Sequence, residues 1–315
     1  MKISVIIVTY NRKEDLLTSI PHYLNQTYPN KEIIVVDNAS TDGTKEEIPK
    51  RFPQVKYYWL PENFDIRSIN LGVYWSDGDI IWRCDSDSYP ATPDTFEKIV
   101  DIFLKHPDIH IIATQEVEKD NFELRWNWYP YPVDKENVPE KGYPANGFVG
   151  TGAAIRREVF NTIGGFSGFG YEEFDFAARA IIAGFEVRYF PNIRVVHEVS
   201  PRVRNRVHRW LCSYEQYTRF SWKFFPFWQA LCRTFWILAF QFAEGLYRRF
   251  SPLVLLEGAL LVLTTMLKTR RTERTIAPPD KLKKITMGKS FFSYQFKLYK
   301  QFLEIKHKKR KKHKR

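Results

Sequence analysis

Three short apolar runs, each followed at once by polar residues, place the tightest limit on how this chain can fold. The runs occupy residues 3–8, 33–36 and 80–82 and consist largely of β-branched and other bulky apolar side chains. Such runs are typical of strands that are covered on both faces of a sheet. Leucine and isoleucine at helical spacing separate the first two runs, and turn-forming residues follow the second. Strands that alternate with helices predict an α/β fold with a mostly parallel, wound sheet.

The polar residues at the ends of these runs predict a ligand site. Asn11 follows the first run, Asp37 ends the second, and Asp85 and Asp87 follow the third. In open α/β sheets, ligands bind beyond the carboxyl ends of the strands, where these side chains are expected to lie. Asp85 and Asp87 have an alternative role that needs no ligand. A carboxylate after a strand can cap the helix that follows, and a helix is expected over residues 93–104.

The residue types limit the kind of ligand. The turn after the first run, Thr9-Tyr10-Asn11-Arg12, has no glycine, so it lacks the fingerprint of a dinucleotide site. The chain also has no Walker-type Gly-rich loop that ends in Lys-Ser or Lys-Thr. Two aspartates separated by a single residue supply hard oxygen ligands, which suit Mg²⁺ or Mn²⁺ bridging to a diphosphate. The sequence therefore predicts a divalent-cation site at Asp85 and Asp87.

Five segments, in order along the chain, resemble the family 2 glycosyltransferases, whose nucleotide-sugar-binding domain has the GT-A fold. Residues 5–12 resemble the first strand and its nucleotide loop, residues 35–44 the second-strand motif, residues 85–87 the metal-binding Asp-x-Asp, residues 150–166 the acceptor-side segment, and residues 172–197 the motif that carries the catalytic base. Together the matches run across residues 3–198. The branch that the chain resembles most is the rhamnosyltransferase-like group, which builds cell-surface polysaccharides.

The resemblance implies a nucleoside-diphosphate sugar as the donor and Mg²⁺ or Mn²⁺ as the cofactor. The residues that it places at the nucleotide are Thr9, Asn11, Arg12, Asp37, Asn70 and Asp85, with Asp37 accepting a hydrogen bond from the base. The residues that it places at the metal are Asp85, Asp87 and His197, with Asp87 as the principal ligand. His197 has a second interpretation, because a histidine at a strand end is often a satisfied core residue.

A carboxylate is expected to take the proton of the acceptor hydroxyl as that hydroxyl attacks the sugar. The resemblance assigns this catalytic role to Glu173, with Glu172 as the alternative. Asp175, the third acidic residue of the motif, is expected to bind the acceptor, to orient Arg179 or to cap a helix. Direct displacement by the acceptor inverts the anomeric configuration, so an inverting transferase without a covalent intermediate is expected.

Two segments depart from the family pattern. The stretch before the third strand is usually rich in glycine and alanine, but residues 63–72 carry bulkier side chains and keep only Asn63, Asn70 and Gly72. The family therefore does not predict the donor contacts of this loop. The base motif is more often Glu-Asp, so Glu173 would carry its carboxylate on a longer arm.

The C-terminal third differs from the rest of the chain in charge and in aromatic content. The net charge is +12, but residues 1–201 carry −9, residues 202–267 carry +6 and residues 268–315 carry +15. This change divides the chain into a GT-A domain (1–201), an aromatic and basic region of amphipathic helices (202–267) and a basic, partly disordered tail (268–315). A membrane-spanning helix needs about 20 apolar residues, and the best candidate, residues 250–267, is shorter and contains Glu257. Helices that lie in the membrane interface are therefore expected.

Basic residues beside apolar helices indicate an anionic membrane surface as a partner. Nucleic acid is the alternative partner, but the neighbouring helices are apolar and the chain has no RNA-binding motif. The first apolar run ends at Val8 and is too short for a signal peptide. These features predict a cytoplasmic protein bound peripherally to the cytoplasmic face of a membrane, where a glycan or lipid-linked acceptor is within reach.

Two other functions are open to a chain of this kind. A nucleotidyltransferase that makes nucleotide sugars would carry a Gly-rich, basic loop after its first strand, and residues 10–14 lack the glycines. A non-catalytic protein that binds sugar nucleotides would not need Asp85, Asp87 and Glu173 together. Both functions are alternatives to glycosyl transfer.

Overall fold

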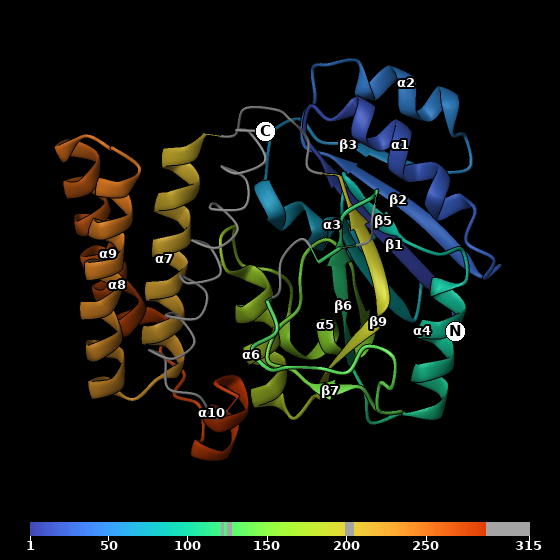
Figure 1. Cartoon of the computed structure of the whole chain (residues 1–315). Coiled ribbons are helices and arrows are strands. Elements are labelled where there is room, and N and C mark those ends of the chain that lie inside the picture. Colours follow the sequence, from blue (N-terminus) through green and yellow to red (C-terminus); the bar gives the residue numbers. More distant parts are fainter. Residues whose placement is uncertain (121–122, 125–127, 199–204, 288–315) are drawn as a thin grey trace, which may run out of the picture.

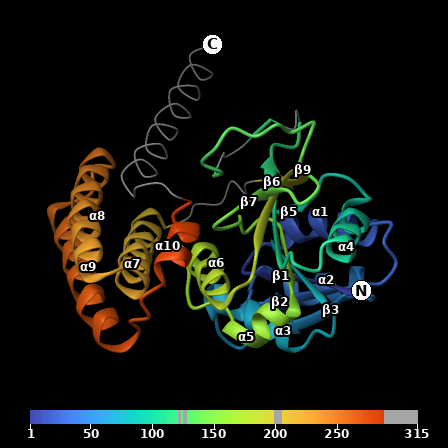
Figure 2. The same cartoon turned by 90° about the horizontal axis from the view of Figure 1, so that it is seen from below.

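A computed structural model describes residues 1–120, 123–124, 128–198 and 205–287. It consists of an α/β part built on one sheet and a group of long helices beside it (Figure 1). Seen from below, the long helices form a separate layer next to α6 (Glu172–Ala183), and the sheet with its covering helices lies on the other side of α6 (Figure 2). The α/β class predicted from the sequence is confirmed.

The sheet contains nine strands within the described residues. They are β1 (Ile3–Thr9), β2 (Lys31–Asp37), β3 (Lys56–Trp59), β4 (Ile80–Asp85), β5 (Ser88–Pro90), β6 (Ile111–Val117), β7 (Tyr143–Pro144), β8 (Ala153–Arg156) and β9 (Val187–His197). Their order across the sheet is β3-β2-β1-β4-β8-β6-β9-β5, and β7 also pairs with β9.

The half of the sheet formed by β3, β2, β1 and β4 is parallel, as predicted. Thr9 pairs with Asp37 and Val8 pairs with Asp85, so three strands end level with one another. The other half is mixed, because β8 runs antiparallel to both β4 and β6. Among the described residues no helix joins β6 to β8, and strands without a helical crossover pair antiparallel. The prediction of a mostly parallel sheet therefore applies to its N-terminal half.

Alternating side chains along the strands give the sheet two buried faces. Val5 and Ile7 of β1 pack in one core with α1 (Lys13–Leu24), α2 (Thr44–Arg51) and α4 (Thr95–Lys105). Ile6 points the opposite way and packs in a second core with α3 (Ser68–Tyr74), α5 (Arg157–Ile163) and α6. Because both faces are covered, a ligand reaches the sheet at the edge where the strands end.

Within the described residues, four helices follow β9, namely α7 (Arg206–Phe224), α8 (Phe227–Tyr247), α9 (Pro252–Thr272) and α10 (Pro279–Ile285). Polar contacts attach this region to the α/β part at several places. Lys223 Nζ of α7 lies 2.8 Å from Asp175 Oδ1 of α6. Asn146 Nδ2 donates a 2.6 Å hydrogen bond to the carbonyl oxygen of Ile285 in α10. The long helices are thus joined to the sheet domain through α6 and its surroundings.

The C-terminal helical region expected from the sequence is present, but its helices are longer than expected. α9 continues past residue 267, where the predicted boundary lies, and ends at Thr272. It is long and apolar enough to cross a membrane by length and composition, and 22% of its apolar window is buried. The candidate expected from the sequence, residues 250–267, ends directly before Lys268. Of the predicted basic tail (268–315), residues 288–315 lie outside the described residues.

Candidate active site

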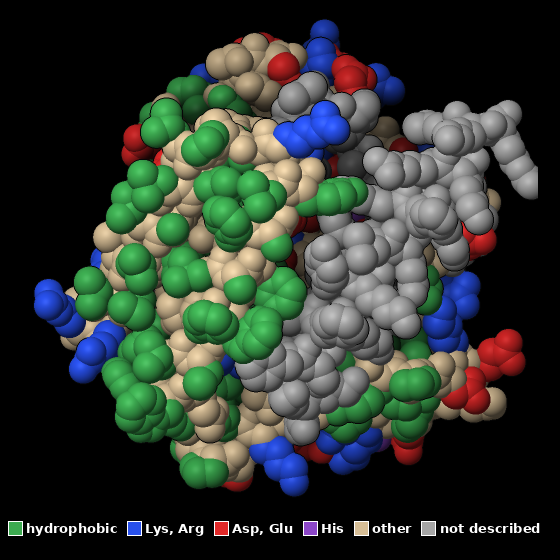
Figure 3. All heavy atoms as spheres, turned by 60° about the vertical axis from the view of Figure 1, so that its left-hand side comes forward, with side chains coloured by type: hydrophobic (Ala, Val, Ile, Leu, Met, Phe, Trp, Pro, Cys, Tyr) green, Lys and Arg blue, Asp and Glu red, His purple; other side chains and the backbone are tan. Residues whose placement is uncertain are grey.

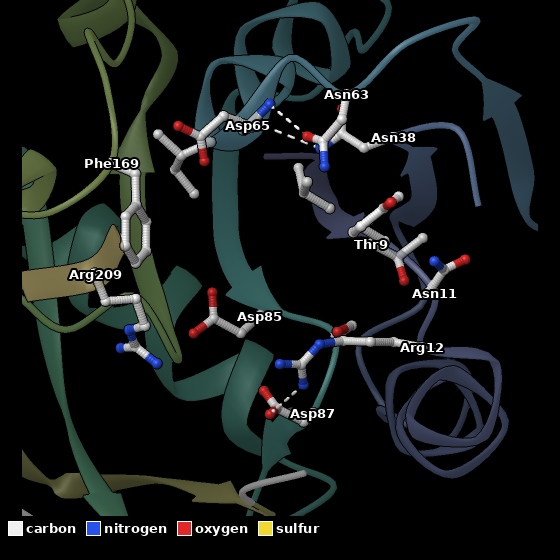
Figure 4. Close-up of a pocket in the computed structure, with 14 residues that line it drawn as sticks. Thr9, Asn11, Arg12, Asn38, Asn63, Asp65, Asp85, Asp87, Phe169 and Arg209 are labelled. Atoms are coloured by element: carbon white, nitrogen blue, oxygen red, sulfur yellow. Dashed lines mark hydrogen bonds and ion pairs between the residues drawn. The ribbon is translucent and has the colours of Figure 1, made fainter. Parts of the chain in front are cut away.

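A cavity of about 480 Å³ opens at the carboxyl edge of the parallel strands. It is lined by Val8, Thr9, Tyr10, Asn11, Arg12, Asn38, Asn63, Asp65, Ile66, Asp85, Ser86, Asp87, Phe169 and Arg209. Figure 4 shows Asp85 between Thr9 and Asn11 on one side and Phe169 and Arg209 on the other. Of the predicted site residues, Thr9, Asn11, Arg12, Asp85 and Asp87 line this cavity.

The loop after β1 is shaped by Asn11, whose φ of 53° lies in the left-handed region. Asparagine tolerates this region better than most residues. Its side-chain oxygen accepts a 2.6 Å hydrogen bond from the N–H of Thr41, and its own N–H donates to Ser40 Oγ at 2.8 Å. The hydroxyl of Thr9 is buried and has no hydrogen-bond partner among the described residues. Because an unsatisfied buried hydroxyl is costly, Thr9 is a candidate contact for a bound ligand.

Asp37 does not line the cavity, although it lies at the end of β2. It is fully buried, and its carboxylate accepts a 2.9 Å hydrogen bond from the N–H of Ser40 and another from the hydroxyl of Tyr57. The next residue, Asn38, lines the cavity, and its Nδ2 donates to Ser68 Oγ at 3.0 Å. Sequence reasoning missed Asn38 because the aspartate was the more conspicuous residue of the turn. A contact between Asp37 and the nucleotide base stays a prediction.

Asn70 also lies away from the cavity lining and clamps a neighbouring loop. Its Nδ2 donates to the carbonyl oxygen of Phe166 at 2.9 Å, and its Oδ1 accepts from the N–H of Phe166 at 2.8 Å. A Cβ at Gly165 would lie 2.1 Å from Asn70 Oδ1, so this contact requires a glycine. Asn70 thus positions the start of the loop that carries Phe169, and its role at the nucleotide stays a prediction.

Asp85, Asp87 and His197 lie together at the ends of β4 and β9. One ligand atom from each residue lies within 4.8 Å of the other two. Pairing of β5 with β9 sets Ser88 opposite His197, which brings the imidazole to the aspartates. Carboxylates favour Mg²⁺ and Mn²⁺, and imidazole binds transition metals. The residues present therefore fit a divalent cation.

A second carboxylate orients the histidine of this cluster. His197 Nδ1 lies 2.9 Å from Glu116 Oε1, and His197 Nε2 lies 3.4 Å from Asp87 Oδ1. A carboxylate on one ring nitrogen is the usual partner of a metal-binding histidine. Burial lowers the pKa of His197, but hydrogen bonds to Asp87 and Glu116 outweigh it and raise the pKa to about 9. Sequence reasoning missed Glu116 because no motif surrounds it on β6.

Arg12 adds a cation to the same cluster. Its Nη1 lies 2.7 Å from Asp87 Oδ2 and 3.1 Å from Asp15 Oδ2, and Figure 4 shows its guanidinium turned toward Asp87. The alternative role of Asp85 and Asp87 as helix caps is wrong. The N-cap residue of α4 is Asp94, and β5 lies between the aspartates and that helix.

The first turn of α6 brings the two candidate bases beside a buried arginine. The side chain of Arg83 is 2% exposed, and its Nη2 lies 3.5 Å from Glu173 Oε1 and 3.9 Å from Glu172 Oε1. Its Nη1 lies 3.0 Å from Asp85 Oδ1. A Cβ at Gly150 would lie 1.7 Å from Arg83 Nη1, so the glycine leaves room for this cluster. Arg83, which the sequence analysis did not single out, links the candidate bases to the cation site.

The two glutamates differ in their surroundings. Glu172 Oε2 accepts a 2.6 Å hydrogen bond from the N–H of Gly170, and its side chain is 5% exposed. The side chain of Glu173 is 19% exposed. Burial, followed by the charge of Glu172, raises the pKa of Glu173 to about 8, although Arg83 opposes the shift. A carboxylate with a raised pKa is suited to accept a proton near neutral pH.

Asp175 joins α6 to α7 and does not line the cavity. Its Oδ2 lies 2.8 Å from Arg179 Nε, and its Oδ1 lies 2.8 Å from Lys223 Nζ. Burial works to raise the pKa of Asp175, but Lys223 and Arg179 hold it below its usual value. These contacts agree with the expectation that Asp175 orients Arg179. Because both carboxylate oxygens are paired within the protein, a contact between Asp175 and the acceptor stays a prediction.

α7 completes the wall of the cavity. Arg209 lines it, and the Arg209 guanidinium carbon lies 5.6 Å from the ring centre of Phe169. Gly170 packs so closely on α7 that a Cβ there would lie 2.9 Å from the carbonyl oxygen of Cys212. Because the sequence analysis ended the catalytic domain at residue 201, it assigned no site residue to α7. The cavity is instead lined by residues from both sides of residue 201.

Comparison with known proteins identifies the family. The sequence profile described as Glycosyl transferase family 2 matches residues 4–164. The putative glycosyltransferase EpsE of Bacillus subtilis (strain 168) is 30% identical over 170 residues, which are 52% of this chain and 60% of EpsE. The uncharacterized glycosyltransferase YwdF of the same organism is 28% identical over 208 residues, 64% of this chain and 75% of YwdF.

Solved structures show the same fold at low sequence identity. The mannosyltransferase PcManGT from Pyrobaculum calidifontis, in complex with GDP-Man and Mn²⁺, has a TM-score of 0.54 at 18% identity, covering 96% of this chain and 80% of PcManGT. S. aureus TarS 1-349, in complex with UDP-GlcNAc, has a TM-score of 0.58 at 13% identity, covering 86% of this chain and 90% of TarS 1-349. The fold is that of the GT-A glycosyltransferases, and the chain belongs to glycosyl transferase family 2.

Proposed function

We propose that this protein transfers a sugar from a nucleoside-diphosphate sugar to an acceptor hydroxyl. The observation that carries the proposal is the convergence of Asp85, Asp87 and His197 at one edge of the sheet, with their ligand atoms within 4.8 Å of one another. Arg83 connects this cluster to Glu173, the proposed base. PcManGT holds GDP-Man and Mn²⁺ in its complex, and TarS holds UDP-GlcNAc, which supports a nucleotide sugar as the donor.

The aspartates and the histidine would hold the cation, and Mn²⁺ fits this mixed oxygen and nitrogen set better than Mg²⁺. A bound divalent cation supplies Lewis-acid stabilisation of the negative charge that develops on the departing diphosphate. Arg209 adds positive charge from the opposite wall of the cavity. Thr9 offers a buried hydroxyl, and Asn38 lines the same cavity while its amide holds Ser68 and Phe64 at the end of the parallel strands.

Glu173 accepts the proton of the acceptor hydroxyl in this proposal. Its side chain is partly exposed, whereas Glu172 is tied to the N–H of Gly170. The raised pKa of Glu173 matches the task of a base, and Arg83 opposes the shift by favouring the ionised carboxylate. The acceptor oxygen then forms a bond to the anomeric carbon while the bond to the diphosphate breaks. One such displacement inverts the anomeric configuration.

The helices α8 and α9 are the proposed membrane contact. Their exposed large apolar side chains are Phe227, Trp228, Leu231, Phe235, Trp236, Phe242, Leu246 and Tyr247 on α8, and Leu253, Leu256, Leu260, Leu263 and Leu267 on α9. Figure 3 shows hydrophobic side chains gathered on this side of the molecule. An apolar area of this extent on a protein surface marks an interaction site. The exposed side of α9 inserts into one leaflet, while Gly258 and Val262 on its other side pack inward.

Membrane attachment places the enzyme where lipid-linked acceptors lie, so the product belongs to surface polysaccharide or glycolipid synthesis. We assign the contact to the cytoplasmic face, where nucleotide sugars are made and anionic lipids attract basic residues. Arg248, Arg249, Arg270 and Arg271 lie at the ends of α8 and α9. Such residues suit headgroups at the edge of the inserted area.

A screen of nucleotide sugars tests the proposal. The purified protein is incubated with UDP-, GDP- and dTDP-sugars, with Mn²⁺ or with EDTA, and release of nucleoside diphosphate is measured. We expect Mn²⁺-dependent release from one group of donors that share a base. Binding of nucleotide sugars without any turnover, in the presence of a range of glycan and polyprenol acceptors, would point to the non-catalytic alternative.

A further inference from the structure

We propose that a second cavity, between α7 and α8, binds the phosphate of a lipid-linked acceptor. The cavity measures about 410 Å³, and Arg206, Arg209 and Arg248 are among the residues that line it. The inference rests on the proposed function, because it names the class of acceptor that this glycosyltransferase uses. No motif in the sequence points to this cavity.

The charge of the cavity favours an anion. Three arginines line it, against a single acidic residue, Glu244. Both carboxylate oxygens of Glu244 accept hydrogen bonds from other residues of the cavity lining. Arg248 Nε donates to Oε1 at 2.9 Å, and the hydroxyl of Tyr214 donates to Oε2 at 2.9 Å. Arg206 and Arg209 bring the lining to a net positive charge. Arginine guanidinium groups match the geometry of phosphate oxygens.

A buried donor in the same wall also lacks an acceptor. Trp210 lines the cavity and is 3% exposed, and its Nε1 has no hydrogen-bond partner among the described residues. An indole N–H donates only, so burial without an acceptor costs free energy. A phosphate oxygen in the cavity would provide the missing acceptor.

The position of the cavity assigns it to the acceptor. Arg209 lines both this cavity and the one that holds the cation site. Tyr217 lines it as well, and its ring centre lies 4.7 Å from that of Tyr171, which directly precedes Glu172 and Glu173. The cavity therefore adjoins the donor site through Arg209, and through Tyr217 it adjoins the segment that leads into the candidate bases. The diphosphate of the donor itself is accounted for by the cation cluster.

The neighbouring surface argues for a lipid rather than a free anion. Glu244 and Arg248 of α8 line the cavity, while Phe242, Leu246 and Tyr247 of the same turns are exposed. A phosphate bound at the arginines thus lies within one helix diameter, about 10 Å, of the apolar surface proposed to enter the membrane. An amphiphile joins the two environments, because its headgroup binds in the cavity and its chain stays with the apolar side chains.

Calorimetric binding to the full-length protein in a neutral detergent, with EDTA present to keep the donor site without cation, tests the inference. The probes are farnesyl diphosphate, farnesol and inorganic diphosphate. We expect farnesyl diphosphate to bind at least ten-fold more tightly than either of the others. Arg206→Ala and Arg248→Gln should each weaken its binding at least five-fold. The matched control is Arg271→Ala, an exposed arginine of α9 that does not line the cavity, and it should bind as the wild type does.

Several results would overturn the inference. Equal binding of inorganic diphosphate would mean a free-anion site, and equal binding of farnesol would mean apolar contact alone. Unchanged binding in Arg206→Ala, which alters an exposed residue and so should leave the fold intact, would place the probe elsewhere. A loss in Asp87→Ala as large as in Arg206→Ala would place it in the donor cavity. If the probe fails to bind while nucleotide sugars are still turned over, this inference alone is wrong. If it binds but no nucleotide sugar is turned over, the cavity binds an isoprenoid phosphate, but the proposed function is wrong and the assignment of the cavity to an acceptor falls with it.

Discussion

Arg83 Nη2 lies 3.5 Å from Glu173 Oε1 in a part of the protein where the arginine side chain is only 2% exposed. This contact influences whether the candidate base is protonated or ionised. Burial and the neighbouring Glu172 favour the protonated form of Glu173, and Arg83 favours the ionised form. The same guanidinium reaches Asp85, so the charge of the cation site and the state of the base are coupled through one side chain.

Replacing the base while keeping its shape should remove transfer. We expect Glu173→Gln to lower the rate of transfer by roughly 10²–10⁴-fold, the usual contribution of a general base. The affinity for the nucleotide sugar should stay close to that of the wild type, because Glu173 does not line the donor cavity. Initial rates and donor binding, measured on the same preparation, separate the two effects. A variant that transfers sugar at the wild-type rate would remove Glu173 from the mechanism.

The same variant should not be less stable. The pKa of Glu173 is raised from 4.5 to about 8, so the folded protein favours the protonated carboxyl. The stability that this group contributes is present below pH 4.5 and is lost as the pH rises toward 8. The amide that replaces the carboxyl cannot ionise, so Glu173→Gln should gain thermal stability relative to the wild type over that range. Thermal midpoints at pH 5 and pH 8.5 therefore show whether lost activity reflects chemistry or unfolding.

The pH dependence of transfer should report the pair of glutamates. A base must be ionised to accept a proton, so the rate should rise with pH through the raised pKa of Glu173, near 8. Glu172→Gln removes the second cause of that shift and should move the rising limb to lower pH. Its amide oxygen can still accept from the N–H of Gly170, which preserves the turn. If Glu172→Gln abolishes transfer at every pH instead, Glu172 is the base.

The cation site can be tested against a neighbouring aspartate. We expect Asp87→Ala to lose Mn²⁺-dependent turnover, because it removes the carboxylate that contacts both Arg12 and His197. The control is Asp94→Ala at the start of α4, which changes an aspartate of the same segment that does not line the cavity. Manganese titrations of both variants provide the measurement. An equal loss in the two variants would show a general effect on the segment.

Much of the cavity at the carboxyl edge of the parallel strands could be predicted from the sequence, because its residues directly follow the strands. A strand of fixed direction delivers whatever follows it to the carboxyl edge of the sheet, so Asn11, Asp85 and Asp87 were placed correctly before any contact was known. His197 lies far along the chain, and only the family motif suggested it. The directions of the side chains after β2 were harder to predict. Asp37 is buried in the core, whereas the next residue, Asn38, lines the cavity.

The residues that the sequence did not reveal depend on packing between distant segments. Glu116 reaches His197 from a neighbouring strand, and Arg83 reaches Glu173 across the space that Gly150 leaves open. Glu116 belongs to no motif, and Arg83, although it stands two residues before Asp85, is not part of the Asp-x-Asp pattern. Arg209 was hidden for a different reason, because a change in composition near residue 201 looked like a functional boundary. The helix beyond that boundary, α7, packs against the turn before α6 that leads into the candidate bases.

The proposed membrane surface makes a prediction about lipid binding. Leu256 and Leu260 of α9 are 57% and 53% exposed, so replacing both with glutamate should leave the fold intact. The double variant should lose binding to anionic vesicles in a flotation assay, because charged side chains resist insertion into lipid. Leu104→Glu on α4 changes a leucine that is 63% exposed and lies outside α8 and α9. It should float with the vesicles as the wild type does, and flotation of the Leu256/Leu260 variant would refute the assignment of the surface.

The products formed from matched substrates test glycosyl transfer most directly. The protein is given Mn²⁺ with a nucleotide sugar and an acceptor in one reaction, and with a nucleoside triphosphate and a sugar 1-phosphate in another. Glycosyl transfer predicts nucleoside diphosphate and a glycosylated acceptor in the first reaction, no pyrophosphate in the second, and loss of the first activity in Asp87→Ala. Pyrophosphate release in the second reaction, with no nucleoside diphosphate in the first, would contradict it and identify a nucleotidyltransferase.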